Sequence, residues 1–99
     1  MGVDLQRELR LALESGEVAV GFREAMKAVR AGKAKLLIVA SNHPDGVERL
    51  LGEASGIPVY RFKGSNMDLG ALCGRRHTVS ILAVKKPGAS AILSLAGGE

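Results

Sequence analysis

Apolar and polar positions follow two different periods along this chain, and each change of period marks an expected element. Residues 18–20 and 36–40 are runs of apolar residues, which is typical of strands buried within a sheet. Between these runs, apolar residues recur every three or four positions, which predicts an amphipathic helix with the packing face Phe22, Ala25, Met26 and Val29. Gly21 and Gly32 stand at the two ends of this helix, so the whole stretch predicts a β-α-β unit.

The segments on either side of this unit continue the alternation of helices and strands. The pattern predicts a first helix that residues 15–16 end, a helix that residues 44–45 begin and residues 55–56 end, and a short helix at 67–72. It also predicts strands at 59–62 and 78–84, a turn at 85–88 and a last short helix or turn at 89–95. Asp4 is expected to cap the first helix, and Ser65 with Asp68 to form a capping box. The strand at 59–62 follows a proline, so it is expected at the sheet edge. Helices and strands interspersed without a repeat or linker predict one α/β domain over residues 1–99, a three-layer α-β-α sandwich.

The two ends of the β-α-β unit are expected to meet at one edge of the sheet. Parallel strands joined by a right-handed helical crossover place Gly21 and Asn42 at the carboxyl edge, where α/β folds usually bind ligands. A helix N-terminus at this edge favours phosphate, and Arg23 adds a charge beside it. Asn42 could read a base edge there, or only form an Asx-turn or cap the next helix. The loop at 74–77 precedes its strand, so it joins this edge only if the last strand runs antiparallel to the first two.

Composition narrows the class of protein. The chain has 99 residues, of which 46% are apolar and 24% charged, as in an ordinary globular domain. Fourteen Lys and Arg against ten Asp and Glu give a net charge of +4, which suits a polyanionic partner. Aromatic residues make up only 3%, which argues against RNA-binding modules that stack bases on paired sheet aromatics.

The single cysteine and the apolar runs bear on the compartment. Cys73 has no partner for an internal disulfide and fits a reducing setting. No apolar run approaches the roughly 18 residues of a membrane span, and the charged start of the chain argues against a secretory signal. We therefore expect a cytoplasmic protein without membrane association.

Two basic groups are candidates for contact with a polyanion. On the helix of the β-α-β unit, Arg23, Lys27 and Arg30 share a second face, although such a stripe is more often a solvated helix surface. In the loop before the last strand, Arg75 and Arg76 could hold phosphates or could serve solubility alone.

Signals for catalysis or metal binding are weak. Cys73 and His77 have a spacing that a metal pair could use, but the chain has no other Cys and one other His, so a structural zinc site is not expected. Core packing is the simpler role for Cys73. Gly32 and Lys33 are followed by Ala34, where a P-loop needs Ser or Thr. We expect neither an enzyme nor a bound cofactor or metal.

Several stretches together resemble one family of proteins in order and spacing. They are residues 20–23, Lys27, and residues 30–42, 55–62, 68–70, 74–75 and 77–80. This set is similar to the thirty-e family of large-subunit ribosomal proteins, which in turn is similar in fold to a wider group of kink-turn RNA binders. The resemblance covers the chain essentially from end to end. It implies a four-stranded mixed sheet between helices, with three loops at one edge that hold a sharply bent RNA internal loop.

The resemblance also implies a role and a set of site residues. The implied role is that of a structural constituent of the large ribosomal subunit. Such a protein binds ribosomal RNA and is monomeric when isolated. By the resemblance, Gly21 and Arg23 match the first RNA-contacting loop, Asn42 matches the second, and His77 matches the third. The expected RNA-binding set is Gly21, Phe22, Arg23, Lys27, Arg30, Asn42, Arg75, Arg76 and His77.

Two other functions stay open from the residues alone. The chain could be a protein-interaction subunit of an RNA-processing complex, in which the basic face only steers association. Mixed α/β sheets also host catalysis, so a small enzyme is the third possibility. Its pocket would be lined by Glu24, His43 and Cys73.

Overall fold

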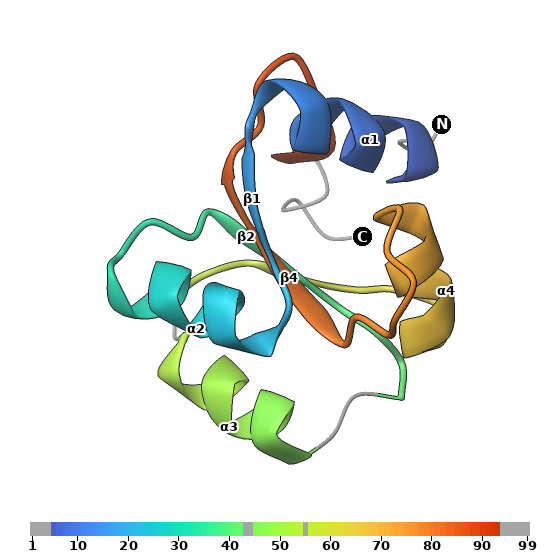
Figure 1. The fold of residues 1–99 in the computed structure, drawn as a ribbon. Helices are drawn as coiled ribbons and strands as arrows, with labels where there is room; N and C mark the ends of the chain where they lie inside the picture. The colour runs from blue at the N-terminus through green and yellow to red at the C-terminus, as the bar shows by residue number, and fades with distance from the viewer. Residues whose placement is uncertain (1–4, 43–44, 55, 94–99) are drawn as a thin grey trace.

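Helices cover both faces of one sheet in the computed structural model, which describes residues 5–42, 45–54 and 56–93 (Figure 1). In chain order, the described elements are α1 (Leu5–Ser15), β1 (Glu17–Val20), α2 (Phe22–Arg30), β2 (Leu36–Val39), α3 (Asp45–Glu53), β3 (Val59–Arg61), α4 (Asn66–Leu72) and β4 (Ile81–Lys86). The expected cap at Asp4, the candidate His43 and residues 94–95 of the expected last short helix or turn lie outside the described residues.

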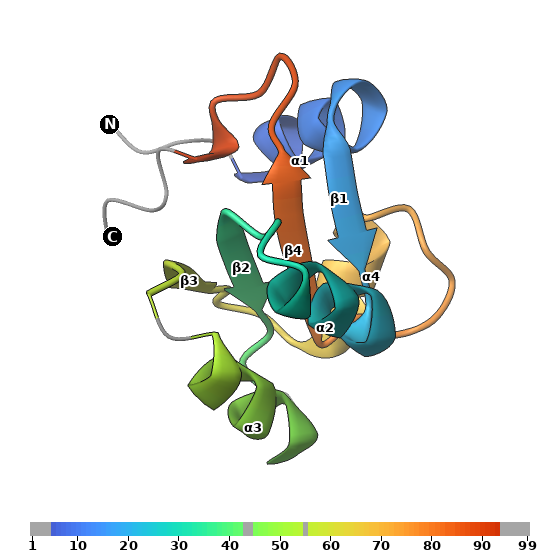
Figure 2. The same cartoon turned by 90° about the vertical axis from the view of Figure 1, so that its left-hand side faces the viewer.

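β4 lies inside the sheet, although it is the last of the described strands in the chain. The strand order is β1-β4-β2-β3, with β4 antiparallel to β1 and to β2, and with β2 parallel to β3. The expected mixed sheet is therefore confirmed, and β3 is the edge strand that its pattern predicts. Because β4 opposes β1 and β2, the loop that precedes it reaches the edge at which those two strands end (Figure 2).

The alternation of side chains along β2 explains the three layers. All four residues of β2 are buried, and successive side chains of a strand point to opposite faces. Leu37 and Val39 pack with buried residues of α2 and α3, whereas Leu36 and Ile38 pack with buried residues of α1 and α4. Figure 1 shows the sheet between these two helix pairs, so the expected α-β-α sandwich is confirmed. Each such leucine or isoleucine stabilises the fold by about 1.5–3 kcal/mol through burial.

The structure corrects two boundaries near the end of the chain. The sequence predicts a strand at 78–84, whereas β4 begins at Ile81 and continues to Lys86. Residues 78–80 instead bridge α4 and the sheet, because the Val79 N–H donates to the Asn66 carbonyl. At the other end, Lys86 pairs with Glu17 of β1, so the expected turn at 85–88 begins two residues late. The expected last short helix or turn is present as far as the described residues reach, as 3₁₀ conformation at residues 92–93.

Phe22 does not join the packing face that its spacing predicts. Phe22 is 39% exposed, whereas Ala25 and Val29 of the same stripe are buried. Phe22 is the first residue of α2, and its ring lies near Gly46 at the start of α3. A Cβ added to Gly46 would lie 3.9 Å from Cζ of the Phe22 ring. The stripe therefore describes the helix face correctly from its second turn onward.

Candidate nucleic-acid interface

Segments far apart in the sequence meet where β1 and β2 end (Figure 2). The Gly21 N–H donates to the Ile81 carbonyl at 3.0 Å, and the Ala40 N–H donates to the Ser80 carbonyl at 2.9 Å. We call this edge of the molecule the rim and define it by Gly21, Ser41, Asn42, Asn66 and residues 77–80. The rim thus brings together Gly21, Asn42 and the loop that contains His77, as the sequence requires for a shared site.

Gly21 leaves open space at the rim beside the N-terminus of α2. Its φ of +98° lies in the region that favours glycine, and an added Cβ would meet nothing within 4 Å. As the N-cap of α2 it has no side chain to bond the first-turn N–H groups of the helix, and α2 has no side-chain cap. The N-terminus of α2 therefore presents free N–H groups and partial positive charge beside an open surface.

A network of amides holds the centre of the rim. The Asn66 N–H donates to Asn42 Oδ1 at 2.6 Å, and Asn42 Nδ2 donates to Asn66 Oδ1 at 3.3 Å. Asn66 Nδ2 in turn lies 3.5 Å from Ser80 Oγ, to which it donates. Asn42 therefore binds the start of α4, and none of its hydrogen bonds to described residues caps α3. One N–H and one lone pair of its amide remain for another partner.

The end of β2 is tied to the loop before α4. Both the N–H and the hydroxyl of Ser41 donate to the Gly64 carbonyl, at 2.9 and 2.8 Å. The capping box that the sequence predicts is present: Ser65 Oγ accepts from the Asp68 N–H, and Asp68 Oδ2 accepts from the Ser65 N–H, each at 3.1 Å. These bonds fix the backbone on which Asn42 and Asn66 meet.

The basic stripe of α2 divides between two environments. Arg23 and Lys27 are exposed, and Lys27 Nζ lies 3.6 Å from Glu24 Oε2 one turn earlier. Arg30, at the far end of the helix, donates to both carboxylate oxygens of Glu53 on α3, at 3.0 and 3.2 Å. Hydrogen bonding to Glu53 raises the pKa of Arg30, and the bond from Arg30 lowers the pKa of Glu53. The structure therefore does not bring Arg30 to the rim.

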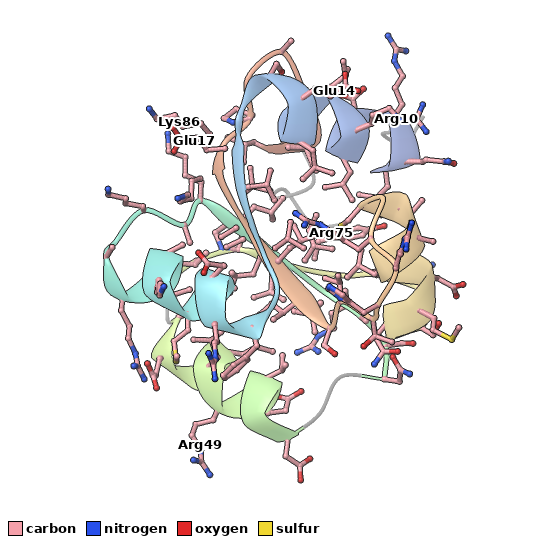
Figure 3. The ribbon with its side chains drawn as sticks, in the orientation of Figure 1. Arg10, Glu14, Glu17, Arg49, Arg75 and Lys86 are labelled. Carbon is pink, nitrogen blue, oxygen red and sulfur yellow. The ribbon has the colours of Figure 1, made fainter. Side chains whose placement is uncertain are left out.

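The loop before β4 also divides along its length. The Arg75 N–H donates to the Gly70 carbonyl at 2.9 Å, so Arg75 closes α4 at the end that is roughly 10 Å from the rim, as expected for a seven-residue helix. Figure 3 shows Arg75 in the region between α1 and α4. Arg76 is exposed in the middle of the loop, and His77 is exposed, with Nδ1 3.3 Å from the Thr78 carbonyl oxygen. Of the expected basic residues here, Arg75 is thus set apart from the rim.

Glu24 and Cys73, the two described residues of the enzymatic alternative, do not share a pocket. Cys73 lines a hollow between α1 and α4, whereas Glu24 lies exposed on α2, which covers the opposite face of the sheet. Burial raises the pKa of the Cys73 thiol to about 11, although the charge of Arg75 lowers it. A thiol with this pKa is protonated near neutrality and is a poor nucleophile. Within the described ranges, no group of three His, Cys, Asp or Glu side chains could hold a metal ion.

Asn66 is a rim residue that sequence reasoning misses, although it contributes two hydrogen bonds to the amide network with Asn42. It follows the capping-box serine directly, and this position alone gave no sign of a partner 24 residues earlier. The signal that could have found it is topological, because an antiparallel last strand also brings the start of α4 to the rim.

A mixed four-stranded sheet between two helix pairs, with an open glycine turn and a polar rim, defines a class of small α-β-α domains that bind through loops at one sheet edge. Residues 4–94 match the model of the ribosomal protein L7Ae/L30e/S12e/Gadd45 family, and the chain belongs to this family.

Curated relatives extend over nearly the whole chain. Three examples, each with the name large ribosomal subunit protein eL30, come from archaea of different genera. The protein from Pyrobaculum neutrophilum is 45% identical over 94% of this chain and 95% of its own length. The protein from Aeropyrum pernix is 39% identical over 95% of this chain and 97% of its own length, and that from Methanosphaera stadtmanae is 38% identical over 94% and 98%. The expected resemblance to the thirty-e family is therefore confirmed.

Family membership supports the expectation that the chain is not an enzyme, because these relatives are named as ribosomal proteins and not as enzymes. In the described part of the chain, no helix is both long and apolar enough to cross a bilayer.

Proposed function

We propose that this chain is a structural constituent of the large ribosomal subunit, and that its rim binds a sharply bent, kink-turn-like internal loop of ribosomal RNA. In this proposal residues 1–99 act as one RNA-binding domain, monomeric when isolated and located on cytoplasmic ribosomes. The relatives named eL30 support the ribosomal role. The single observation that supports the rim as the RNA site is the meeting of Gly21, Asn42 and the His77 loop at one edge.

The chemistry of the rim suits a bent RNA. A-form helices hide their base edges in a deep groove, so proteins read RNA where a loop or bulge exposes bases and bends the backbone. The open surface at Gly21 and the free N–H groups of α2 would accept a phosphate, with Arg23 and Lys27 as further phosphate contacts. The remaining N–H and lone pair of Asn42 would meet a base edge.

Two exposed rings complete the proposed site. Phe22 and His77 lie at the rim ends of their segments, where an extruded base could stack on either ring. Arg76 stays in the proposed set as a loop phosphate contact. Arg30 and Arg75 leave it, because the first is bonded to Glu53 and the second lies at the far end of α4.

Two substitutions on one helix test the proposal with the same change of charge. Arg23→Gln should weaken binding to a kinked RNA about tenfold and reduce the slope of log affinity against log salt by about 1. Arg30→Gln, at the other end of α2, should leave the affinity within about twofold, since its partner is Glu53. Gel-shift titrations at several salt concentrations measure both. Equal effects of the two variants, or equal affinity of the native chain for kinked RNA and a matched straight duplex, would contradict the proposal.

A further inference from the structure

A second basic surface lies at the edge of the sheet opposite the rim. A hollow of about 470 Å³ there is lined by Glu17, Gly32, Lys33, Lys35, Lys85 and Lys86. Two of the lysines follow α2 and two end β4, so the sheet topology brings together residues about fifty positions apart in the sequence. Figure 3 shows Lys86 and Glu17 side by side at this end of the molecule. We call this surface the lysine hollow.

The backbone of the lysine hollow is fixed by hydrogen bonds. The Lys33 N–H donates to the Ala28 carbonyl at 2.9 Å and the Gly32 N–H donates to the Val29 carbonyl at 3.1 Å, which is the Schellman pattern at the end of a helix. Gly32 has a φ of +72°, as this motif requires. The Lys35 N–H then donates to the Val84 carbonyl at 2.8 Å, so the wall from the α2–β2 loop is joined to β4.

The charges of the lysine hollow are not balanced within the described protein. Its one carboxylate is Glu17, whose Oε2 lies 3.7 Å from Lys86 Nζ, and this leaves a net charge of +3. In the hollow four lysines share one carboxylate, whereas Arg30 and Glu53 on the neighbouring helices form a pair of one cation with one anion. The lysine hollow therefore holds three of the four net positive charges of the whole chain. Like charges at this density repel, and an anion would relieve the repulsion.

We infer that the lysine hollow is a second RNA-binding site, which holds backbone phosphates of an RNA segment distinct from the one at the rim. This inference rests on the proposed function. An ammonium group binds phosphate as a point charge, without the planar fork by which arginine reads a base. Since the lining includes neither arginine nor an aromatic ring, the site would hold the RNA backbone without regard to sequence.

The two sites are far enough apart to act separately. β4 runs from the rim to the lysine hollow, and its six residues span about 17 Å. Charges are largely screened beyond about 8 Å at physiological salt, so the lysines contribute little to RNA that touches only the rim. A chain with both sites occupied would tie two RNA segments to opposite edges of one sheet.

A capture experiment with matched variants tests the inference. Kinked RNA is immobilised, saturated with the chain, and then exposed to a labelled straight RNA duplex that lacks an internal loop. The native chain should capture the duplex, and Lys33→Gln with Lys85→Gln should reduce capture about tenfold and lower the salt slope by about 1.8. The control Arg10→Gln with Arg49→Gln removes the same charge from exposed positions outside the hollow, and should leave capture unchanged (Figure 3).

The outcomes separate this inference from the proposed function. Equal capture by the two double variants overturns the lysine hollow, and so does a native chain that binds kinked RNA but captures no duplex. A native chain that binds the straight duplex through Lys33 and Lys85, yet prefers no kinked RNA, supports the lysine hollow and contradicts the rim proposal. Inorganic pyrophosphate tests whether the hollow binds a small phosphate compound in place of an RNA backbone. If it shifts the amide resonances of Gly32 and Lys33 while the duplex does not, the occupant is a small phosphate compound and the inference fails.

Discussion

At the level of single residues, Asn42 illustrates how a side chain can serve the fold and still be available to a ligand. Its amide exchanges two hydrogen bonds with Asn66, so these two residues should be energetically coupled. We expect Asn42→Ala and Asn66→Ala each to destabilise the fold by about 0.5–1.5 kcal/mol, and the double variant by about 0.5 kcal/mol or more less than the sum. Urea unfolding of the three variants measures the coupling.

Ser15 provides the control for that cycle. Its hydroxyl bonds the Leu11 carbonyl and the Ala89 N–H, on a different part of the surface. Asn42→Ala and Ser15→Ala should therefore be additive within about 0.5 kcal/mol. If the destabilisations by Asn42→Ala and Asn66→Ala are additive as well, the two residues are not energetically coupled and the amide network does not stabilise the rim.

Cys73 gives a second prediction at this scale. Because burial raises its pKa to about 11 from an ordinary value of 9.0, the folded thiol should be alkylated roughly 100-fold more slowly at pH 8 than an unperturbed cysteine. Its protonated form stabilises the fold fully below pH 9, and that contribution is lost as pH rises from 9 through 11. Iodoacetamide kinetics on folded and urea-unfolded protein measure the difference, and equal rates would show that the thiol is not protected.

Single residues also differ in how far sequence alone could place them. Gly21 could be predicted, because a strand that turns directly into a helix needs a residue tolerant of positive φ. Asn66 could not, because its partner Asn42 depends on where α4 begins relative to β2. The stripe of α2 placed Arg30 with Arg23, but spacing on a helix carries no information about Glu53 on the neighbouring helix.

Among the elements, α4 depends on a close approach between its backbone and the loop that follows. An added Cβ at Gly70 would lie too close to the His77 carbonyl oxygen, and nothing at that backbone position can yield without moving the loop. Gly70→Ala should therefore destabilise the fold by about 1–3 kcal/mol. Gly52→Ala is the matched control: Gly52 also lies inside a helix, α3, and an added Cβ meets nothing within 4 Å.

The control should move stability in the opposite direction. Alanine in an exposed helix interior is favoured over glycine by about 0.5–1 kcal/mol, so Gly52→Ala should raise the melting temperature while Gly70→Ala lowers it. Thermal unfolding followed by circular dichroism measures both. Two variants that shift the melting temperature equally would mean that the loop at His77 adapts without cost.

Helix and strand periods located most elements, and they failed where polar residues belong to a strand. Lys85 and Lys86 look like a turn because charge and the following proline break the apolar run, yet both lie in β4. Lys86 can end a strand because it is exposed and pairs with Glu17 across the ladder. Residues 78–80 show the reverse case, in which a β-rich run is used by the loop that builds the rim.

At the scale of the whole molecule, the topology distributes charge in a way that the linear sequence conceals. The net charge of +4 suggested a basic surface for a polyanionic partner, but most of the surplus positive charge lies in the lysine hollow and not at the predicted site. Outside that hollow, the chain has ten basic residues and nine acidic residues, so its remaining net charge is only +1. Only the position of β4 between β1 and β2 brings the two lysine pairs together.

The same topology predicts the order in which parts of the molecule open. β4 pairs with a strand on each side and has four buried residues, whereas β3 is a three-residue edge strand with no buried residue. Amides of Leu82 and Ala83 should therefore exchange only by global unfolding, and that of Tyr60 at least about tenfold faster by local opening. Hydrogen exchange followed by nuclear magnetic resonance, corrected for intrinsic rates, measures this order. Dilute urea should accelerate exchange at Leu82 strongly and at Tyr60 little, because local opening exposes less surface. If Tyr60 is protected as well as Leu82, the sheet opens as one unit and its edge is no weaker than its centre.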